Sequence, residues 1–158
     1  VLQPVVTRHT AVERVNVARL QANAIEAAEQ TERLTIPEVR DSIDLGKLLD
    51  SWPEGRRLMM CDETGGGPPI AEALSALDDA ARAAPWAIVI GPEGGFAENE
   101  LQALRRIKDV TSVGLGPRIL RADTAALAAL ACWQALVGDW RRPAPRLSGD
   151  DRTSRVTV

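Results

Sequence analysis

Apolar residues along this chain occur in two patterns. Some form short unbroken runs, and others recur every three or four positions over longer stretches. The unbroken runs predict three buried strands, at residues 57–61, 86–90 and 110–115. Two shorter β-rich segments, residues 1–7 and 34–39, predict further strands. We expect the second near a sheet edge or a strand end, because Pro37 has no N–H to donate to a neighbouring strand.

Stretches with helical periodicity separate these strands. They predict helices at residues 12–30, 44–49, 70–83, 98–107 and 124–140. Asp44 is expected to cap the second of them, and Asp123 or Thr124 the last. Strands that alternate with helices predict the α/β class, with a mostly parallel sheet covered by helices on both faces.

The last predicted helix differs from the others because residues 124–138 carry no charge and only Gln134 is strongly polar. A helix that is apolar all round must be covered on every side. A second copy of the chain would supply that cover in a homodimer, and a central position in the core of the monomer is the alternative. The uncharged stretch is too short to cross a bilayer, so no membrane contact is expected.

Composition fits one globular domain, since 45% of the 158 residues are apolar and 26% are charged. Five arginines and two aspartates give residues 141–158 a charge of +3, which leaves −6 for the rest of a chain with net charge −3. A chain whose first 140 residues are acidic overall, with no tyrosine and a single phenylalanine, is not typical of a stand-alone nucleic-acid binder. The Pro-, Ser- and Arg-rich residues 142–158 are expected to form a disordered tail after a domain at residues 1–141.

Both cysteines, Cys61 and Cys132, lie in apolar segments, and two cysteines are too few for a cysteine-based metal site. We expect reduced thiols in the core of a cytoplasmic protein, and no bound metal. No leading segment has the pattern of a signal peptide.

Two loops follow predicted buried strands, which is where open α/β sheets bind ligands. The first reads Gly91-Pro92-Glu93-Gly94-Gly95-Phe96 and the second covers residues 115–125. Glycines let the backbone approach a ligand closely, but the spacing matches neither common phosphate-binding motif, and a carboxylate at Glu93 would repel phosphate. A ligand with hydroxyls or a positive centre fits better, with a plain strand-to-helix turn as the alternative.

The second loop brackets Ile119 and Leu120 with Arg118 and Arg121. Such a segment can bury the two apolar side chains against a flat apolar ligand while it presents backbone amides. For each arginine, a salt bridge to a neighbouring acid is the alternative.

Together the two loops resemble those of the RsmE family of 16S ribosomal RNA uridine-N3 methyltransferases, which belong to the SPOUT class of S-adenosylmethionine enzymes. The resemblance rests on Ile90-Gly91-Pro92-Glu93-Gly94-Gly95-Phe96 and Leu115-Gly116-Pro117-Arg118-Ile119-Leu120-Arg121, and on the upstream runs Ala27-Ala28-Glu29-Gln30 and Ile36-Pro37-Glu38-Val39. It covers roughly residues 1–140. One departure is Ala122-Asp123-Thr124, where the family usually has Thr-Glu-Thr.

The resemblance implies a SPOUT-type α/β knot, in which the last helix threads a C-terminal trefoil knot, and a homodimer with S-adenosylmethionine bound in the knot. It implies cofactor contacts from Gly91, Glu93, Gly94, Leu115, Gly116, Ile119, Leu120 and Thr124. Methylation of uridine N3 requires loss of its proton, so Arg121 is the candidate for stabilising the uridine anion and Glu93 or Asp123 for accepting or orienting the proton. His9 is expected to be structural or solvated.

The family's N-terminal RNA-binding domain, similar to PUA domains, and the first strand and helix of its catalytic domain have no counterpart in this sequence. We therefore expect an N-terminally truncated catalytic domain whose substrate is 16S ribosomal RNA of the small subunit. Two alternatives stay open: an enzyme of the same class that acts on another RNA position, such as a ribose of transfer RNA or ribosomal RNA, and an inactive dimerisation or binding fragment.

Overall fold

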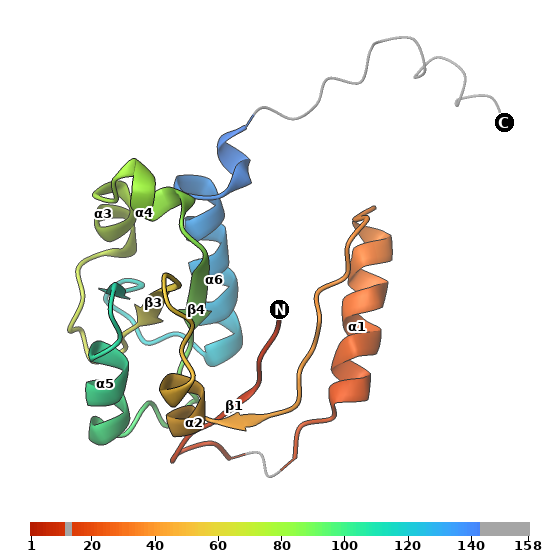
Figure 1. The fold of residues 1–158 in the computed structure, drawn as a ribbon, viewed down its shortest axis with the longest axis horizontal. Helices are drawn as coiled ribbons and strands as arrows, with labels where there is room; N and C mark the ends of the chain where they lie inside the picture. The colour runs from red at the N-terminus through yellow and green to blue at the C-terminus, as the bar shows by residue number, and fades with distance from the viewer. Residues whose placement is uncertain (12–13, 143–158) are drawn as a thin grey trace, which may run out of the picture.

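The computed structural model describes residues 1–11 and 14–142 (Figure 1). The expected disordered tail therefore lies outside the described residues from position 143 onward. Within the described ranges, no helix has the length and apolar content needed to span a membrane.

A three-stranded parallel sheet forms the centre of the molecule, with strand order β4-β3-β5. Its strands are β3 (Arg57–Cys61), β4 (Trp86–Val89) and β5 (Val110–Val113). All three were predicted, and β3 lies in the middle, where Met59 and Met60 are fully buried.

Helices cover both faces of this sheet. Side chains of successive strand residues point to opposite faces, so each strand offers apolar side chains to both helical layers. On one face, Leu58 and Met60 pack with residues of α2 (Leu45–Asp50) and α5 (Glu98–Arg105). On the other face, Met59 and Cys61 pack with residues of α3 (Ile70–Ser75) and α6 (Ala122–Leu136). The predicted α/β class, with a parallel sheet between two helical layers, is confirmed.

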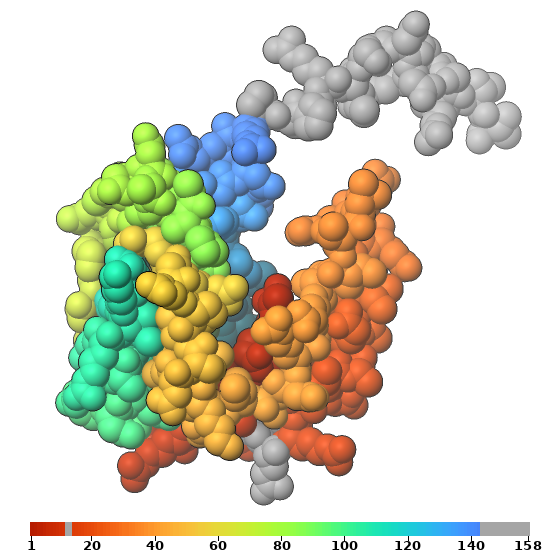
Figure 2. Space-filling model, in the orientation of Figure 1, coloured from red at the N-terminus to blue at the C-terminus, as the bar shows by residue number. Residues whose placement is uncertain are grey.

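The N-terminal part of the chain forms a separate arm, defined here as residues 1–11 and 14–44. Its strands β1 (Val5–Val6) and β2 (Ile43–Asp44) form a two-stranded parallel sheet, and α1 (Val17–Gln30) lies between them in sequence. We call residues 45–142 the body. In Figures 1 and 2 the C-terminal end of α1 stands clear of the body.

The predicted strand at residues 34–39 is wrong. Leu34 is 102% exposed and Ile36 49% exposed, and within this segment only Val39 makes a bridge, to Leu2. No part of the described structure covers these apolar side chains, so the segment stays extended without a ladder. The pairing with β1 forms instead at Ile43, directly before Asp44 caps α2 as expected.

Several helix boundaries also differ from the prediction; α1, for example, begins at Val17. Residues 70–83 form two helices, α3 and α4 (Asp79–Ala83), because the Asp78 carboxylate accepts a hydrogen bond from Ala81 N–H and starts a new helix. At α6, Arg121 occupies the N-cap position, and Asp123 accepts from the adjacent Thr124 N–H instead of capping the helix. The helix ends at Leu136, before a short 3₁₀ turn, η1 (Asp139–Arg141).

Candidate binding site at the carboxyl edge of the sheet

Three loops meet where the parallel strands β3, β4 and β5 end, because parallel strands have their carboxyl ends at one edge. They are residues 62–69, 90–97 and 114–121, called here the first, second and third edge loops. The sequence identified the second and third as candidate ligand loops. The first was not identified from the sequence as a candidate ligand loop, although three glycines and two prolines follow the central strand within eight residues.

The second edge loop turns tightly around its glycines. Gly95 has a φ of +68°, which L-amino acids with a side chain rarely adopt, and its N–H donates to the Pro92 carbonyl at 2.9 Å. The buried Phe96 ring returns over Gly91, where a Cβ atom would lie 3.1 Å from it. The loop shape therefore favours glycine strongly at Gly95, through its φ, and leaves little room for a side chain at Gly91.

The first edge loop is fixed at its base by Asp62, whose side chain is fully buried. Arg105 donates to its carboxylate at 2.9 Å, and both the N–H and the hydroxyl of Thr64 donate to it as well. Burial alone raises the pKa of Asp62, but the hydrogen bonds from Thr64 and Arg105 outweigh burial and hold the pKa below its usual value. The carboxylate is therefore ionised at neutral pH and ties this loop to α5.

The first and third edge loops are joined along their backbones. Gly114 N–H donates to the Pro68 carbonyl at 2.8 Å, and Ile70 N–H donates to the Gly114 carbonyl at 3.0 Å. A Cβ atom on Gly67 would lie 2.7 Å from backbone atoms of Ser112. Because real Cβ atoms do not approach backbone so closely, glycine at position 67 allows the two loops to pack.

The first and second edge loops are joined as well. Glu63 Oε1 accepts from Phe96 N–H at 3.2 Å. From the arm, His9 Nδ1 lies 3.1 Å from the Gly95 carbonyl oxygen. Neither contact was predicted from the sequence. Glu63 and Phe96 are 33 positions apart and His9 and Gly95 are 86 positions apart, and local sequence patterns do not indicate contacts over such separations.

The third edge loop presents the most exposed candidate residues. Ile119 is 86% exposed, and Gly116 has a φ of +112° with no atom within 4 Å of a Cβ built on it. Arg121 Nε lies 3.8 Å from Asp123 Oδ1, and both side chains are largely exposed, so the ion pair is present but weak. The salt-bridge alternative for one of the two arginines is thus found at Arg121.

The candidate residues fall into two groups. Gly91 and Gly94 lie on the second edge loop with the exposed Glu93, while Leu115, Gly116, Ile119 and Leu120 lie on the third, followed by Thr124 on α6. Within residues 1–11 and 14–142, no ion pair connects Glu93 with Arg121. The structure therefore brings the cofactor candidates to one sheet edge and does not join the three catalytic candidates into one cluster.

Cys61, at the end of β3, is not available for chemistry. Burial, with smaller contributions from Cys132 and Glu63, raises the pKa of its thiol to about 12. Both cysteines are free thiols. In the described part of the chain, His, Cys, Asp and Glu side chains form no cluster of three that could hold a metal ion.

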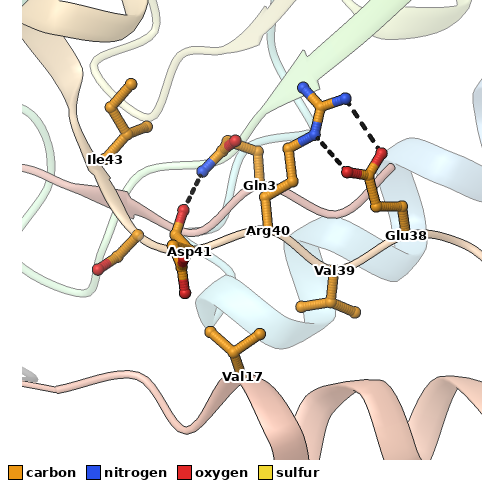
Figure 3. Close-up of a pocket in the computed structure, with 8 residues that line it drawn as sticks. Gln3, Val17, Glu38, Val39, Arg40, Asp41 and Ile43 are labelled. Carbon is orange, nitrogen blue, oxygen red and sulfur yellow. Dashed lines mark hydrogen bonds and ion pairs between the residues drawn. The ribbon is translucent and has the colours of Figure 1, made fainter.

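A shallow hollow lies elsewhere, between the start of α1 and the strands of the arm, with a volume of about 560 Å³ (Figure 3). Three of its polar side chains already have partners: Arg40 donates to Glu38 at 3.0 and 3.1 Å, and Gln3 donates to the Asp41 carbonyl at 2.6 Å. It is open to solvent and distant in the fold from the edge loops, so it is not part of the candidate site.

A parallel α/β sheet with glycine-containing loops gathered at its carboxyl edge is typical of α/β domains that bind a small ligand at that edge. The chain belongs to the RNA methyltransferase domain family, whose model matches residues 1–134.

Two relatives are both named ribosomal RNA small subunit methyltransferase E. The one from Rickettsia conorii is 37% identical over 133 residues, which are 81% of this chain and 50% of the relative. The one from Bacillus subtilis is 37% identical over 108 residues, which are 68% of this chain and 42% of the relative. The resemblance to the RsmE family is confirmed, and the chain spans about half the length of these relatives.

A solved structure gives the same result at the level of the fold. The crystal structure of a ribosomal RNA small subunit methyltransferase E from Neisseria gonorrhoeae, bound to S-adenosyl methionine, matches with a TM-score of 0.71 and 33% identity. The match covers 85% of this chain and 54% of that one.

Proposed function

We propose that this chain is the cofactor-binding part of an S-adenosylmethionine-dependent enzyme that methylates N3 of a uridine in 16S ribosomal RNA. The observation that carries the proposal is the match to the Neisseria gonorrhoeae enzyme bound to S-adenosyl methionine, at 33% identity over 85% of this chain. A substrate made and assembled in the cytoplasm implies that the protein works there.

The edge loops fit such a cofactor. S-adenosylmethionine carries a flat apolar adenine, ribose hydroxyls and a positively charged sulfonium that donates the methyl group. Open space beside Gly116 and the exposed side chain of Ile119 offer an apolar surface next to free backbone. The exposed carboxylate of Glu93 favours a positive centre and disfavours phosphate. Contacts with the cofactor are proposed from Gly91, Glu93, Gly94, Leu115, Gly116, Ile119, Leu120 and Thr124, with backbone contacts from all of these except Glu93 and Thr124.

The chemistry needs a uridine N3 that has lost its proton and lies in line with the methyl group. Arg121 is proposed to stabilise the uridine anion, and Glu93 or Asp123 to accept or orient the proton. Because the pair between Arg121 and Asp123 is long and exposed, at 3.8 Å, little free energy opposes its rearrangement when RNA binds.

A homodimer through α6 belongs to the same proposal. Leu127 is 71% exposed and Leu130 50% exposed, one helical turn apart on the same side of α6. A second copy that packs there would cover both side chains. Light scattering should report a dimer for the wild-type chain and a monomer for Leu127→Lys, and a monomeric wild type would contradict this part. The trefoil knot implied by the family resemblance stays a prediction.

Two measurements test the function. Isothermal titration of the folded chain with S-adenosylmethionine should show one site per chain, and no binding would favour an inactive fragment. Nucleoside mass spectrometry after incubation with small-subunit RNA should then show 3-methyluridine. A methyl group on ribose would replace our substrate assignment with another enzyme of the same class.

A further inference from the structure

One peptide group in the second edge loop is held from two sides. The Gly95 carbonyl oxygen lies 3.1 Å from His9 Nδ1, and the N–H of the same peptide, which belongs to Phe96, donates to Glu63 Oε1 at 3.2 Å. His9 comes from the arm, just after β1, and Glu63 from the first edge loop, just after β3. Two distant segments therefore fix the plane of a single peptide.

The space around this peptide is filled by the same two residues. A Cβ atom on Gly94 would lie 3.0 Å from the His9 Cβ, and one on Gly95 would lie 2.5 Å from Glu63 Oε1. Both glycines are thus needed for His9 and Glu63 to reach the backbone. Gly95 is doubly constrained, because its φ of +68° already disfavours a side chain.

The segments that carry His9 and Glu63 are themselves held by hydrogen bonds. Glu63 directly follows Asp62, the buried carboxylate that receives hydrogen bonds from Thr64 and Arg105. His9 lies in a turn in which Thr7 N–H donates to the Thr10 hydroxyl at 2.9 Å. Next to it, Arg8 N–H donates to Glu100 Oε1 at 2.8 Å, on the first turn of α5. The backbone next to each of the two side chains is therefore held in place by hydrogen bonds of its neighbours.

We propose that His9 and Glu63 are positioning residues that fix the Gly95–Phe96 peptide and thereby pre-organise the second edge loop for S-adenosylmethionine. The inference rests on the proposed function, since the loop is taken as a wall of the cofactor site. A loop that is already held in its binding conformation loses less conformational entropy when the ligand arrives, which raises affinity. Loss of either hydrogen bond should therefore weaken cofactor binding by about five- to tenfold.

The tautomer of His9 follows from its partner. A carbonyl oxygen only accepts, so Nδ1 carries the proton of this bond. Asparagine places an amide N–H near the position of histidine Nδ1, whereas glutamine reaches nearer to Nε2. His9→Asn should consequently keep the contact and His9→Gln should lose it. In the same way, Glu63→Gln keeps an Oε1 acceptor that Glu63→Ala removes.

Hydrogen exchange of the Phe96 amide tests the contact without any ligand. Glu63→Ala should raise the exchange rate by about tenfold, and Glu63→Gln should restore protection. Glu54→Ala, which changes an exposed glutamate ahead of β3, is the matched control and should leave the rate unchanged. If Glu63→Ala leaves the exchange rate of the Phe96 amide unchanged, the positioning role is overturned. This result does not depend on which ligand the chain binds.

Titration with S-adenosylmethionine tests the consequence. His9→Ala and Glu63→Ala should each bind about five- to tenfold more weakly, with His9→Asn and Glu63→Gln close to wild type. The thermal midpoint should fall only by the few degrees that the loss of one hydrogen bond produces, and the KM for RNA should stay unchanged, which a general loss of structure would not allow. Equal affinity in all variants would overturn the inference. No binding by the wild-type chain would overturn the proposed function. The exchange rate of the Phe96 amide would then still show whether Glu63 holds the loop, so failure of the proposed function and failure of the positioning role can be told apart.

Discussion

The arm and the body of this molecule contain apolar residues in equally regular patterns, yet the body buries many of them and the arm few. Its largest fully buried side chains are Leu58, Met59, Met60, Leu74, Leu104 and Val113. In the arm, Ala28 and Val39 are the buried hydrophobic residues among the described positions, while Leu2, Ile25, Leu34 and Ile36 are exposed. Periodicity thus predicts that an element forms, but burial requires a second surface to pack against.

The difference has an energetic consequence. Because the hydrophobic contribution scales with the apolar area removed from water, stability should come mostly from the body. The arm is attached to the body through Val5, which packs against the core face that includes Leu58, and through the contacts of Arg8 with Glu100 and of His9 with Gly95. It should therefore open at a lower free energy than the body.

The largest expected effect compares one truncation in each region. Leu104→Ala removes a side chain that is 1% exposed and should lower the free energy of unfolding by about 3 kcal/mol. Ile25→Ala, at a position 38% exposed in α1, should cost less than about 1 kcal/mol. Urea denaturation followed by circular dichroism measures both. Equal losses would show that α1 is packed more tightly than its exposure indicates.

The same contrast explains what could be predicted from the sequence. The three strands of the body were placed almost to the residue, because a parallel strand buried on both faces has an unbroken apolar run. The segment at residues 34–39 has similar residue types but no covering surface, and the strand prediction failed there. The break at Asp78 was missed because the helical pattern of apolar residues continues across it.

At the candidate site, the glycine-rich second and third edge loops were recognisable because their residues are contiguous. The first edge loop was not recognised as part of the site. Its role depends on the bonds of Glu63 to Phe96 and of Asp62 to Arg105, which connect residues far apart in the chain. Contacts of that kind follow from the fold and leave no local pattern.

A second prediction asks whether the rigidity of the body extends into its edge loops. Gly67→Ala places a Cβ 2.7 Å from the β5 backbone, which cannot move without breaking the sheet, and should cost about 2 kcal/mol. Gly65→Ala in the same loop meets no atom within 4 Å but has a φ of +81°, so strain alone should cost about 1 kcal/mol. Thermal unfolding compares the two variants, and a smaller loss for Gly67→Ala would show that the loop yields.

A third prediction compares an ion pair in each region. In the body, Arg105→Met deprives the buried Asp62 carboxylate of its partner and should cost about 1 to 2 kcal/mol at pH 7, reduced by the partial exposure of Arg105. In the arm, Arg40→Met breaks an exposed pair with Glu38 and should produce no measurable change.

The pH dependence of stability supplies the check on this third prediction. The folded pKa of Asp62 lies below the unfolded value near 3.8, so its contribution is fully present above that value. The contribution is lost as the pH falls below 3.8 and through the folded pKa. Arg105→Met should flatten this part of the profile, because Arg105 is one of the groups that lower the pKa. An unchanged slope would mean that Thr64 alone stabilises the ionised carboxylate.

The smallest effect tests whether arm and body unfold together. All four tryptophans, Trp52, Trp86, Trp133 and Trp140, lie in the body, so their fluorescence reports its unfolding. Ala131→Gly, at an exposed position of α6, should lower the stability measured in this way by about 1 kcal/mol. Ala22→Gly, at an exposed position of α1, weakens its helix by the same intrinsic amount.

If α1 opens independently, Ala22→Gly leaves the fluorescence midpoint unchanged and only speeds hydrogen exchange of amides within α1. If the two glycine variants shift the midpoint equally, arm and body form one cooperative unit. The few contacts of Val5, Arg8 and His9 with the body would then transmit far more stability than their number indicates, and the exposed apolar side chains of the arm would have to be covered in solution.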